Sequence, residues 1–213
     1  MRYLLVIALS ILTLTGCQSA YYSAMEKVGY HKRDIMVDRV EDAKQSQQDA
    51  QQEFSSALEA LSELTGYQGG DLEAMYERIN DRYQDSEAAA QTVRDRIAAI
   101  EDVSEALFDE WQSELQLYTN RSLRRDSERK LTATRNSYQK MLLAMKQAEQ
   151  KMTPVLNTLR DNTLYLKHNL NARTVGALQG EFSNLERQIQ YAISDMNQAI
   201  AESDKFLAKL NAS

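Results

Sequence analysis

The two histidines are the side chains of this sequence with the widest range of chemistry, because imidazole binds metal ions and transfers protons near neutral pH. They are His31 and His168, far apart in the chain. A carboxylate-bridged metal pair in a helical bundle needs a Glu-x-x-His spacing, and a zinc site needs a Cys/His cluster. Neither pattern occurs in the sequence. We therefore expect no metal ion and no cofactor.

The serines and glycines supply no catalytic motif either. The sequence contains no G-x-S-x-G, the motif that exposes the nucleophile of many hydrolases. Gly66, Gly69 and Gly70 are not followed by the Lys-Ser/Thr pair with which a phosphate loop holds a nucleotide. We expect no catalytic residues, and hence a protein that is not an enzyme.

The single cysteine, Cys17, offers a different chemistry, because its thiol can be acylated. It follows Met1-Arg2 and about eleven mostly apolar residues over 4–14, a length typical of a secretory signal peptide and too short for a bilayer span of roughly twenty residues. The tetrapeptide Leu14-Thr15-Gly16-Cys17 resembles the bacterial lipobox. We expect cleavage before Cys17 and acylation of its thiol; the alternative is an incidental thiol in an ordinary N-terminal helix.

Lipidation would attach the chain to a membrane, because each buried CH₂ of an acyl chain contributes about 0.8 kcal/mol. Gln18 and Ser19 follow the cysteine, where an aspartate marks inner-membrane retention in many enterobacteria. We therefore expect an outer membrane lipoprotein that faces the periplasm, rather than one of the inner membrane or cell surface. The expected organisation is a cleaved signal peptide over 1–16, a lipidated tether over 17–30 and a helical bundle domain over 31–213.

The composition favours helices and gives no support to a nucleic acid partner. The chain carries 25 Lys and Arg against 31 Asp and Glu, a formal net charge of −6, and it has no polybasic segment that would follow a phosphate backbone. Seven glycines and one proline are too few for the turns of a sheet protein.

Apolar residues recur at alternating spacings of four and three in four long segments. The stripes run from Met36 to Leu64, from Leu72 to Tyr118, from Leu131 to Leu166 and from Leu178 to Leu210. A spacing that averages 3.5 residues keeps one seam on one side of a helix, and helices bury such seams by wrapping around each other. The pattern predicts an all-α fold: an elongated antiparallel coiled-coil-like bundle of about four helices, up-down-up-down, roughly 60 to 70 Å long.

Residues that break or cap helices place the turns at 66–70, at 119–122 and near 171–176. Asp71 is expected to cap the second helix. The turn at 119–122 contains no glycine or proline, so there the alternative is one uninterrupted helix. Pro154 is expected to kink the third helix, with a new helix beginning at Pro154 as the alternative.

Small residues suggest where helices approach each other. Ala43, Ala50 and Ala57 share one heptad position and would admit a close neighbour. Gly176 and Gly180 form a G-x-x-x-G, which we interpret as a close helix packing site. Trp111 lies on the second stripe and is expected in the core.

The up-down topology brings three cationic stretches to one end: 30–34, 121–130, and Lys205 with Lys209. One interpretation is that anionic phospholipid heads or an acidic partner contact Lys32, Arg33, Arg121, Arg124 and Arg125. The other is a solvated helix end, in which neighbouring acidic residues pair with these cations for little gain. We prefer the second interpretation.

Three stretches carry a resemblance to a known family: "YYSAMEKVGYHKRDIMVDRVEDA", "SLRRDSERKL" and "LKHNLNA". They resemble an uncharacterised bacterial lipoprotein family, the domain of unknown function numbered 2959. The resemblance implies a proteobacterial envelope protein and supplies no catalytic residues.

Two functions are consistent with these features. We expect a lipid-anchored envelope protein whose bundle is a non-enzymatic interaction or spacer module, with a protein partner in the envelope. The alternative is a periplasmic binding module that holds a lipid or acyl chain in a groove between helices, beside Ala43, Ala50 and Ala57. Heptad seams also permit a homo-oligomer.

Overall fold

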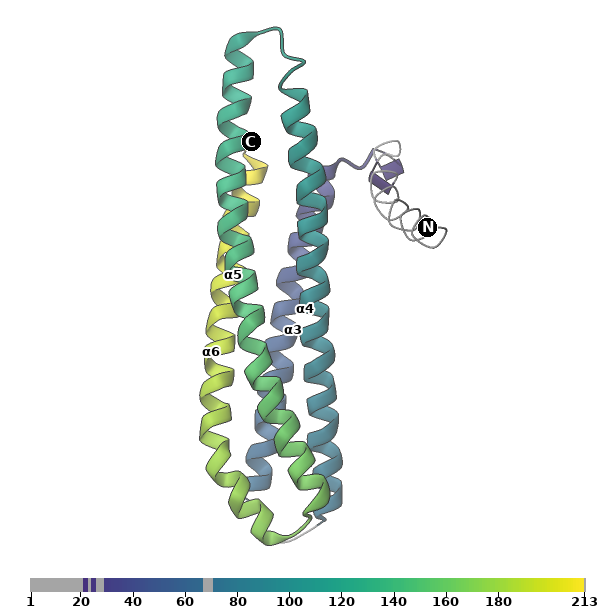
Figure 1. The fold of residues 1–213 in the computed structure, drawn as a ribbon, viewed down its shortest axis with the longest axis vertical. Helices are drawn as coiled ribbons and strands as arrows, with labels where there is room; N and C mark the ends of the chain where they lie inside the picture. Colours follow the sequence, from purple (N-terminus) through teal and green to yellow (C-terminus); the bar gives the residue numbers. More distant parts are fainter. Residues whose placement is uncertain (1–20, 23, 26–28, 67–70, 213) are drawn as a thin grey trace, which may run out of the picture.

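Four long helices make up the structure, which is a computed structural model that describes residues 21–22, 24–25, 29–66 and 71–212. The helices are α3 (Lys32–Thr65), α4 (Leu72–Glu114), α5 (Arg121–His168) and α6 (Ala172–Asn211). Each helix packs against the next, and α3 packs against α6, so the four form a closed antiparallel ring (Figure 1). The predicted all-α, elongated four-helix bundle is confirmed.

Side-chain caps start two of the helices. The Asp71 carboxylate accepts hydrogen bonds from the backbone N–H groups of Glu73 and Ala74 at 3.0 and 3.1 Å, as predicted. The Asn120 side chain accepts from the N–H groups of Ser122 and Leu123 at 2.9 and 3.3 Å. The predicted reversal near 119–122 is therefore confirmed, and an asparagine cap begins the new helix there.

The first helix covers the whole of its predicted stripe, which runs from Met36 to Leu64. It begins at Lys32, after a turn in which Gly29 has a φ of +90°, a conformation that strongly favours glycine. The His31 N–H donates to the Asp34 carboxylate at 3.3 Å and so closes the start of α3.

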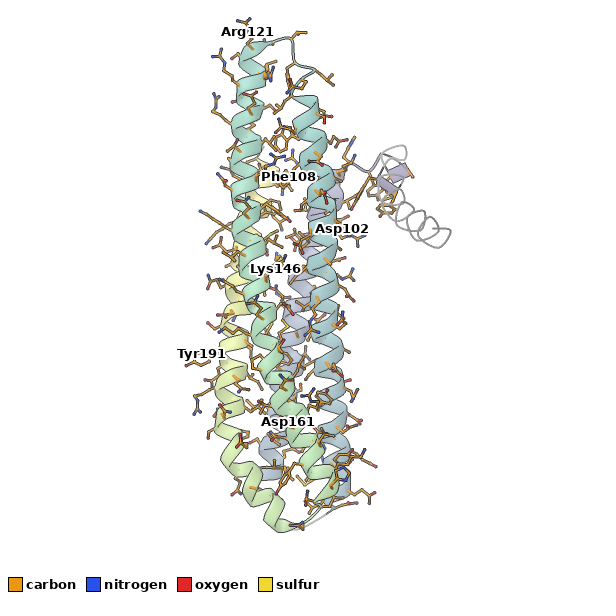
Figure 2. The ribbon with its side chains drawn as sticks, viewed as in Figure 1. Asp102, Phe108, Arg121, Lys146, Asp161 and Tyr191 are labelled. Carbon is orange, nitrogen blue, oxygen red and sulfur yellow. The ribbon has the colours of Figure 1, made fainter. Side chains whose placement is uncertain are left out.

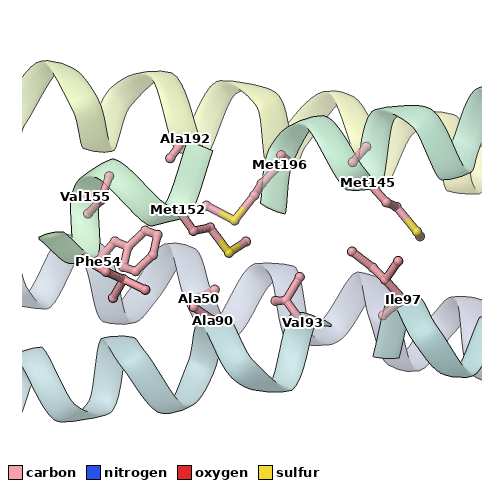
Figure 3. Close-up of a cluster of buried hydrophobic side chains, with 14 of the residues drawn as sticks. Ala50, Phe54, Ala90, Val93, Ile97, Met145, Met152, Val155, Ala192 and Met196 are labelled. Carbon is pink, nitrogen blue, oxygen red and sulfur yellow. The ribbon is translucent and has the colours of Figure 1, made fainter. Parts of the chain in front are cut away.

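The predicted stripes form the core. Alanines on all four helices are fully buried: Ala50, Ala90, Ala148, Ala192 and Ala199. Figure 3 shows Met145, Met152 and Met196 from α5 and α6 facing the smaller side chains of α3 and α4. Small residues let the helices approach closely, and the flexible methionines fill the space that remains. The result is one continuous core along the length of the bundle.

Buried polar side chains interrupt this core at several points, and Gln47 is one of them. Gln47 of α3 is fully buried, and within the described part of the chain neither its Nε2 nor its Oε1 has a hydrogen-bond partner. A buried amide without partners destabilises the folded state by roughly 1–3 kcal/mol.

Replacing Gln47 with methionine is therefore expected to raise the free energy of unfolding by about 1–2 kcal/mol, because methionine has a similar shape and no polar atom to desolvate. Urea unfolding followed by circular dichroism measures this change. Gln48→Met is the control, because Gln48 is exposed on the next position of the same helix. A loss of stability in Gln47→Met alone would show that the amide has a partner in solution.

The third long helix passes through Pro154 without a break. Met152, Val155 and Leu159 all stay buried, so the seam keeps its phase across the proline. The alternative of a new helix beginning at Pro154 is therefore wrong. Pro154 is on the exposed side of α5, where water can reach the carbonyl that a proline leaves without its helical donor.

The G-x-x-x-G of α6 is not a close packing site, so that expectation is wrong. Gly176 and Gly180 are exposed, and a Cβ atom added to either would meet no other atom within 4 Å. The glycines face open space because the buried stripe of this helix runs through other residues, Val175, Leu178 and Leu185.

Gly176→Ala and Gly180→Ala are each expected to stabilise the protein by about 0.5–1 kcal/mol, because alanine lowers the entropy of the unfolded chain and meets no obstacle here. Thermal unfolding of each variant checks this. A decrease in either midpoint would contradict the open environment of that glycine.

Candidate functional site

One end of the bundle is uneven, because α4 and α5 continue beyond the other two helices (Figure 1). Lys32 Nζ at the start of α3 pairs with Glu110 Oε1 of α4 at 2.8 Å. The guanidinium of Arg33 donates to the carbonyl of Leu210, near the end of α6. These contacts mark the level at which α3 begins and α6 ends. The part of the α4/α5 hairpin beyond them, residues 112–130, is called the hairpin tip below.

A second small core stiffens the base of the hairpin tip. It consists of Phe108, Leu115 and Leu131, with Trp111 and Tyr138 packed against it. Trp111 Nε1 donates to Ser127 Oγ at 2.8 Å, which joins α4 to α5. Trp111 is half-buried and packs against this small core, so it lies at the edge of the core and not in its centre.

Aromatic rings connect this small core with the main one. The ring of Tyr138 lies edge-on to Phe108 and to Phe206, with centroid distances of 5.4 and 6.1 Å. Its hydroxyl is 2.7 Å from Ser104 Oγ, within hydrogen-bond distance. Burial is the main cause that raises the pKa of Tyr138, and the hydrogen bond to Ser104 partly opposes it.

The raised pKa of Tyr138 predicts a loss of stability in alkali. The unfolded phenol ionises near pH 10, whereas the folded one stays neutral to higher pH, so the stabilisation is complete below pH 10 and is lost as pH rises through the folded pKa. Tyr138→Phe should therefore show a smaller fall in unfolding free energy between pH 9 and 11 than the unmodified protein. Tyr191→Phe is the control, since Tyr191 is exposed. Equal falls in the unmodified protein and Tyr138→Phe would contradict the prediction.

The outer surface of the hairpin tip is both apolar and cationic. Leu117, Tyr118 and Leu123 are 79%, 41% and 57% exposed. Between Glu114 and Asp126 the chain carries three arginines and no acidic residue. Figure 2 shows Arg121 at the very end of the molecule.

The three arginines differ in their pairing. Arg124 Nε is 3.0 Å from Glu128 Oε1, an exposed pair of little energetic value. Arg125 donates to the backbone carbonyl of Arg121 at 3.3 Å. Within the described residues, neither Arg121 nor Arg125 has an acidic partner. Local pairing thus accounts for Arg124 but not for the other two.

The structure divides the five cations that the sequence grouped together. Lys32 and Arg33 hold α3 against α4 and α6, so they belong to the closure of the bundle. Arg121, Arg124 and Arg125 lie on the projecting hairpin tip. Of the other basic residues expected at this end, Lys205 pairs with Glu202, and Lys209 lines a shallow hollow with Asp126 and Arg129.

Sequence reasoning missed the two exposed leucines of the hairpin tip, Leu117 and Leu123. Their signal was present, because both flank the turn and neither fits the buried stripe. Arg125 also lines a hollow on the side of α5, together with Glu128, Arg129, Thr132, Ala133 and Asn136.

The remaining candidate residues do not come together. His31 precedes α3 at the hairpin end, and His168 ends α5 at the opposite end, as predicted. The described residues contain no group of His, Cys, Asp or Glu side chains suited to a metal ion. Cys17 lies outside the described residues.

The three alanines of the proposed lipid groove are covered by their neighbours. Ala43, Ala50 and Ala57 are at most 2% exposed and belong to the packed core. In this structure the small residues therefore bring helices together and leave no open groove beside them.

Comparisons with known proteins identify a family and no activity. Among the described residues, no helix has the length and apolar character needed to cross a bilayer. No curated protein matches the sequence. A family described as "Protein of unknown function (DUF2959)" matches residues 21–210, which include nearly all of the four helices. The chain therefore belongs to this family.

Proposed function

We propose that the protein is a lipid-anchored envelope lipoprotein whose bundle is a non-enzymatic interaction or spacer module. The observation that carries the proposal is the continuous core, which joins all four helices along their length. A closed ring of helices with such a core resists bending. At 1.5 Å per residue, the 48 residues of α5 correspond to a rod of about 70 Å.

The proposed anchor is Cys17, on the basis of its resemblance to a lipobox cysteine. We place the protein on the periplasmic side of the outer membrane, because Gln18 and Ser19 lack the aspartate associated with inner-membrane retention. The first helix, α3, begins at the hairpin end of the bundle. A rod anchored there would present its other end, with the α3/α4 and α5/α6 turns, to a protein partner in the envelope.

In-cell crosslinking tests this function. A photoreactive amino acid replaces Tyr165, which is 45% exposed near the end opposite the hairpin tip, and in a second variant replaces Leu143, which is 59% exposed nearer the middle of α5. We expect a discrete crosslinked protein from position 165 and a weaker or absent product from position 143. The same experiment at Leu170 samples the α5/α6 turn. No crosslinked protein from either end position would contradict an interaction module.

A shortened rod separates a spacer from a simple binding module. Removing one heptad from each helix at the level of Ala50 keeps all four seams in phase and shortens the bundle by about 10 Å. If the protein is a spacer, the crosslink from position 165 is lost although the bundle stays folded. If the crosslink is retained, the far end binds its partner independently of rod length.

A further inference from the structure

Charge is distributed unevenly along the rod. Residues 59–85, at the end opposite the hairpin tip, include seven acidic and two basic residues. Residues 121–130 of the hairpin tip include five basic and two acidic residues, in a chain whose net charge is −6. The α3/α4 hairpin is therefore acidic, whereas the start of α5 is cationic. In front of an anionic surface, the cationic start of α5 is attracted to that surface.

Exposed apolar side chains accompany the cations. Leu117, Tyr118 and Leu123 extend from the same hairpin tip as Arg121 and Arg125. Leucine and tyrosine next to basic residues are typical of segments that enter the headgroup region of a bilayer. The opposite end also exposes Leu164, Tyr165 and Leu170, and their own turn carries Lys167 and Arg173, but the α3/α4 hairpin at that end is acidic. Within the described residues, the hairpin tip combines three exposed apolar groups with three arginines.

The arginines of the hairpin tip do not stabilise the helix that carries them. Arg121, Arg124 and Arg125 lie in the first turns of α5, where the helix dipole is positive and a nearby cation is unfavourable. The first turn contains no acidic residue, and Asn120 already accepts from the first free backbone amides. Arg121 and Arg125 are therefore exposed cations without an acidic partner in the described chain, and an anionic surface could approach them.

The N-terminal segment approaches the bundle from the same end. Tyr22 is only 7% exposed, and its phenol interacts electrostatically with Asp102, Arg39 and Lys32. Figure 2 shows Asp102 on the part of α4 nearest to this segment. The chain can therefore contact one membrane at two places, through residues that precede α3 and through the hairpin tip.

We propose that the hairpin tip binds the surface of an anionic phospholipid membrane, with Leu117, Tyr118 and Leu123 in the headgroup region and Arg121, Arg124 and Arg125 against the lipid phosphates. This contact would hold the rod upright, with the α3/α4 and α5/α6 turns away from the bilayer. The orientation rests on the proposed function, because it assumes that the rod is anchored to that membrane. Binding by the hairpin tip itself does not require Cys17.

Vesicle binding of a chain without the anchor tests the proposal separately from lipidation. Residues 21–213 contain every helix and every buried core residue of the described structure. This segment is incubated with vesicles of phosphatidylcholine alone or with added phosphatidylglycerol, and bound protein is measured by cosedimentation. We expect binding only with phosphatidylglycerol, and weaker binding as salt is added.

Matched variants identify the hairpin tip as the binding surface. Arg121→Gln, Arg124→Gln and Arg125→Gln together should weaken partitioning about 100-fold, since each basic residue near an anionic surface is worth about fivefold. The control replaces Lys151, Arg160 and Lys167 of the same helix with glutamine, an equal change of charge at exposed positions nearer its other end. Leu117→Ser with Leu123→Ser should also weaken binding. Circular dichroism confirms that each variant is folded.

Four outcomes would overturn the proposal. The first is equal binding to both kinds of vesicle, and the second is an equal loss of vesicle binding in the hairpin-tip triple variant and in the triple control variant. The third is binding to polyglutamate without binding to vesicles, and the fourth is a dimer in which the hairpin tips cover each other. The third outcome would indicate an acidic protein partner and the fourth a second copy of the chain. None of these outcomes affects the proposal that Cys17 is lipidated.

Discussion

Phe54→Ala is expected to lower the free energy of unfolding by about 3–5 kcal/mol. Phe54 is among the largest side chains that are fully buried, and it lies in the middle of the core next to Val155 and Met152 (Figure 3). Its removal loses buried apolar area and leaves a cavity, because four helices held along their whole length cannot move inward at a single layer.

Urea unfolding of the segment 21–213 measures this effect. Gln52→Ala is the matched control, because Gln52 is exposed two residues earlier on α3, and it should change the unfolding free energy by less than about 0.5 kcal/mol. A loss below 1 kcal/mol in Phe54→Ala would show that the core at this level is loosely packed.

Ala90→Leu is expected to destabilise the protein by about 1–3 kcal/mol, although leucine is the more hydrophobic residue. Ala90 is fully buried. It lies beside Ala50, where α3 and α4 pack closely (Figure 3). A larger side chain must push these helices apart or adopt a strained rotamer.

Ala88→Leu provides the control, because Ala88 is exposed two residues earlier on the same helix and leucine is a good helix former. Thermal unfolding of the two variants should therefore give a lower midpoint for Ala90→Leu only. If both variants match the unmodified protein, small residues do not set the helix spacing at this level.

The fold was predictable because its main signal is local and repeated. Stripes such as Met36 to Leu64 recur over many turns, so single polar interruptions do not change their phase. Gln47 shows this well, since it is buried by its position in the stripe and in spite of its amide. The cap at Asp71 was predictable for the same reason, because it acts within a few residues. The turn at 119–122 was also predicted, but Asn120 was not recognised as its cap.

The uneven end of the bundle could not be predicted, because it depends on contacts between residues far apart in the chain. Lys32 pairs with Glu110, and Arg33 binds the carbonyl of Leu210. No local pattern reveals that these two cations are used inside the bundle while Arg121 and Arg125 are not. Likewise, G-x-x-x-G marks a packing site only if the glycines face another helix, and Gly176 and Gly180 do not.

The most direct test of the account is the intact mass of the full chain purified from the envelope of a bacterium that processes lipoproteins. We predict a polypeptide that begins at Cys17 and carries the added mass of acyl chains, and an unacylated product for Cys17→Ser. A full-length protein that keeps residues 1–16 and has no added mass would contradict the account, because the rod would then have no lipid anchor.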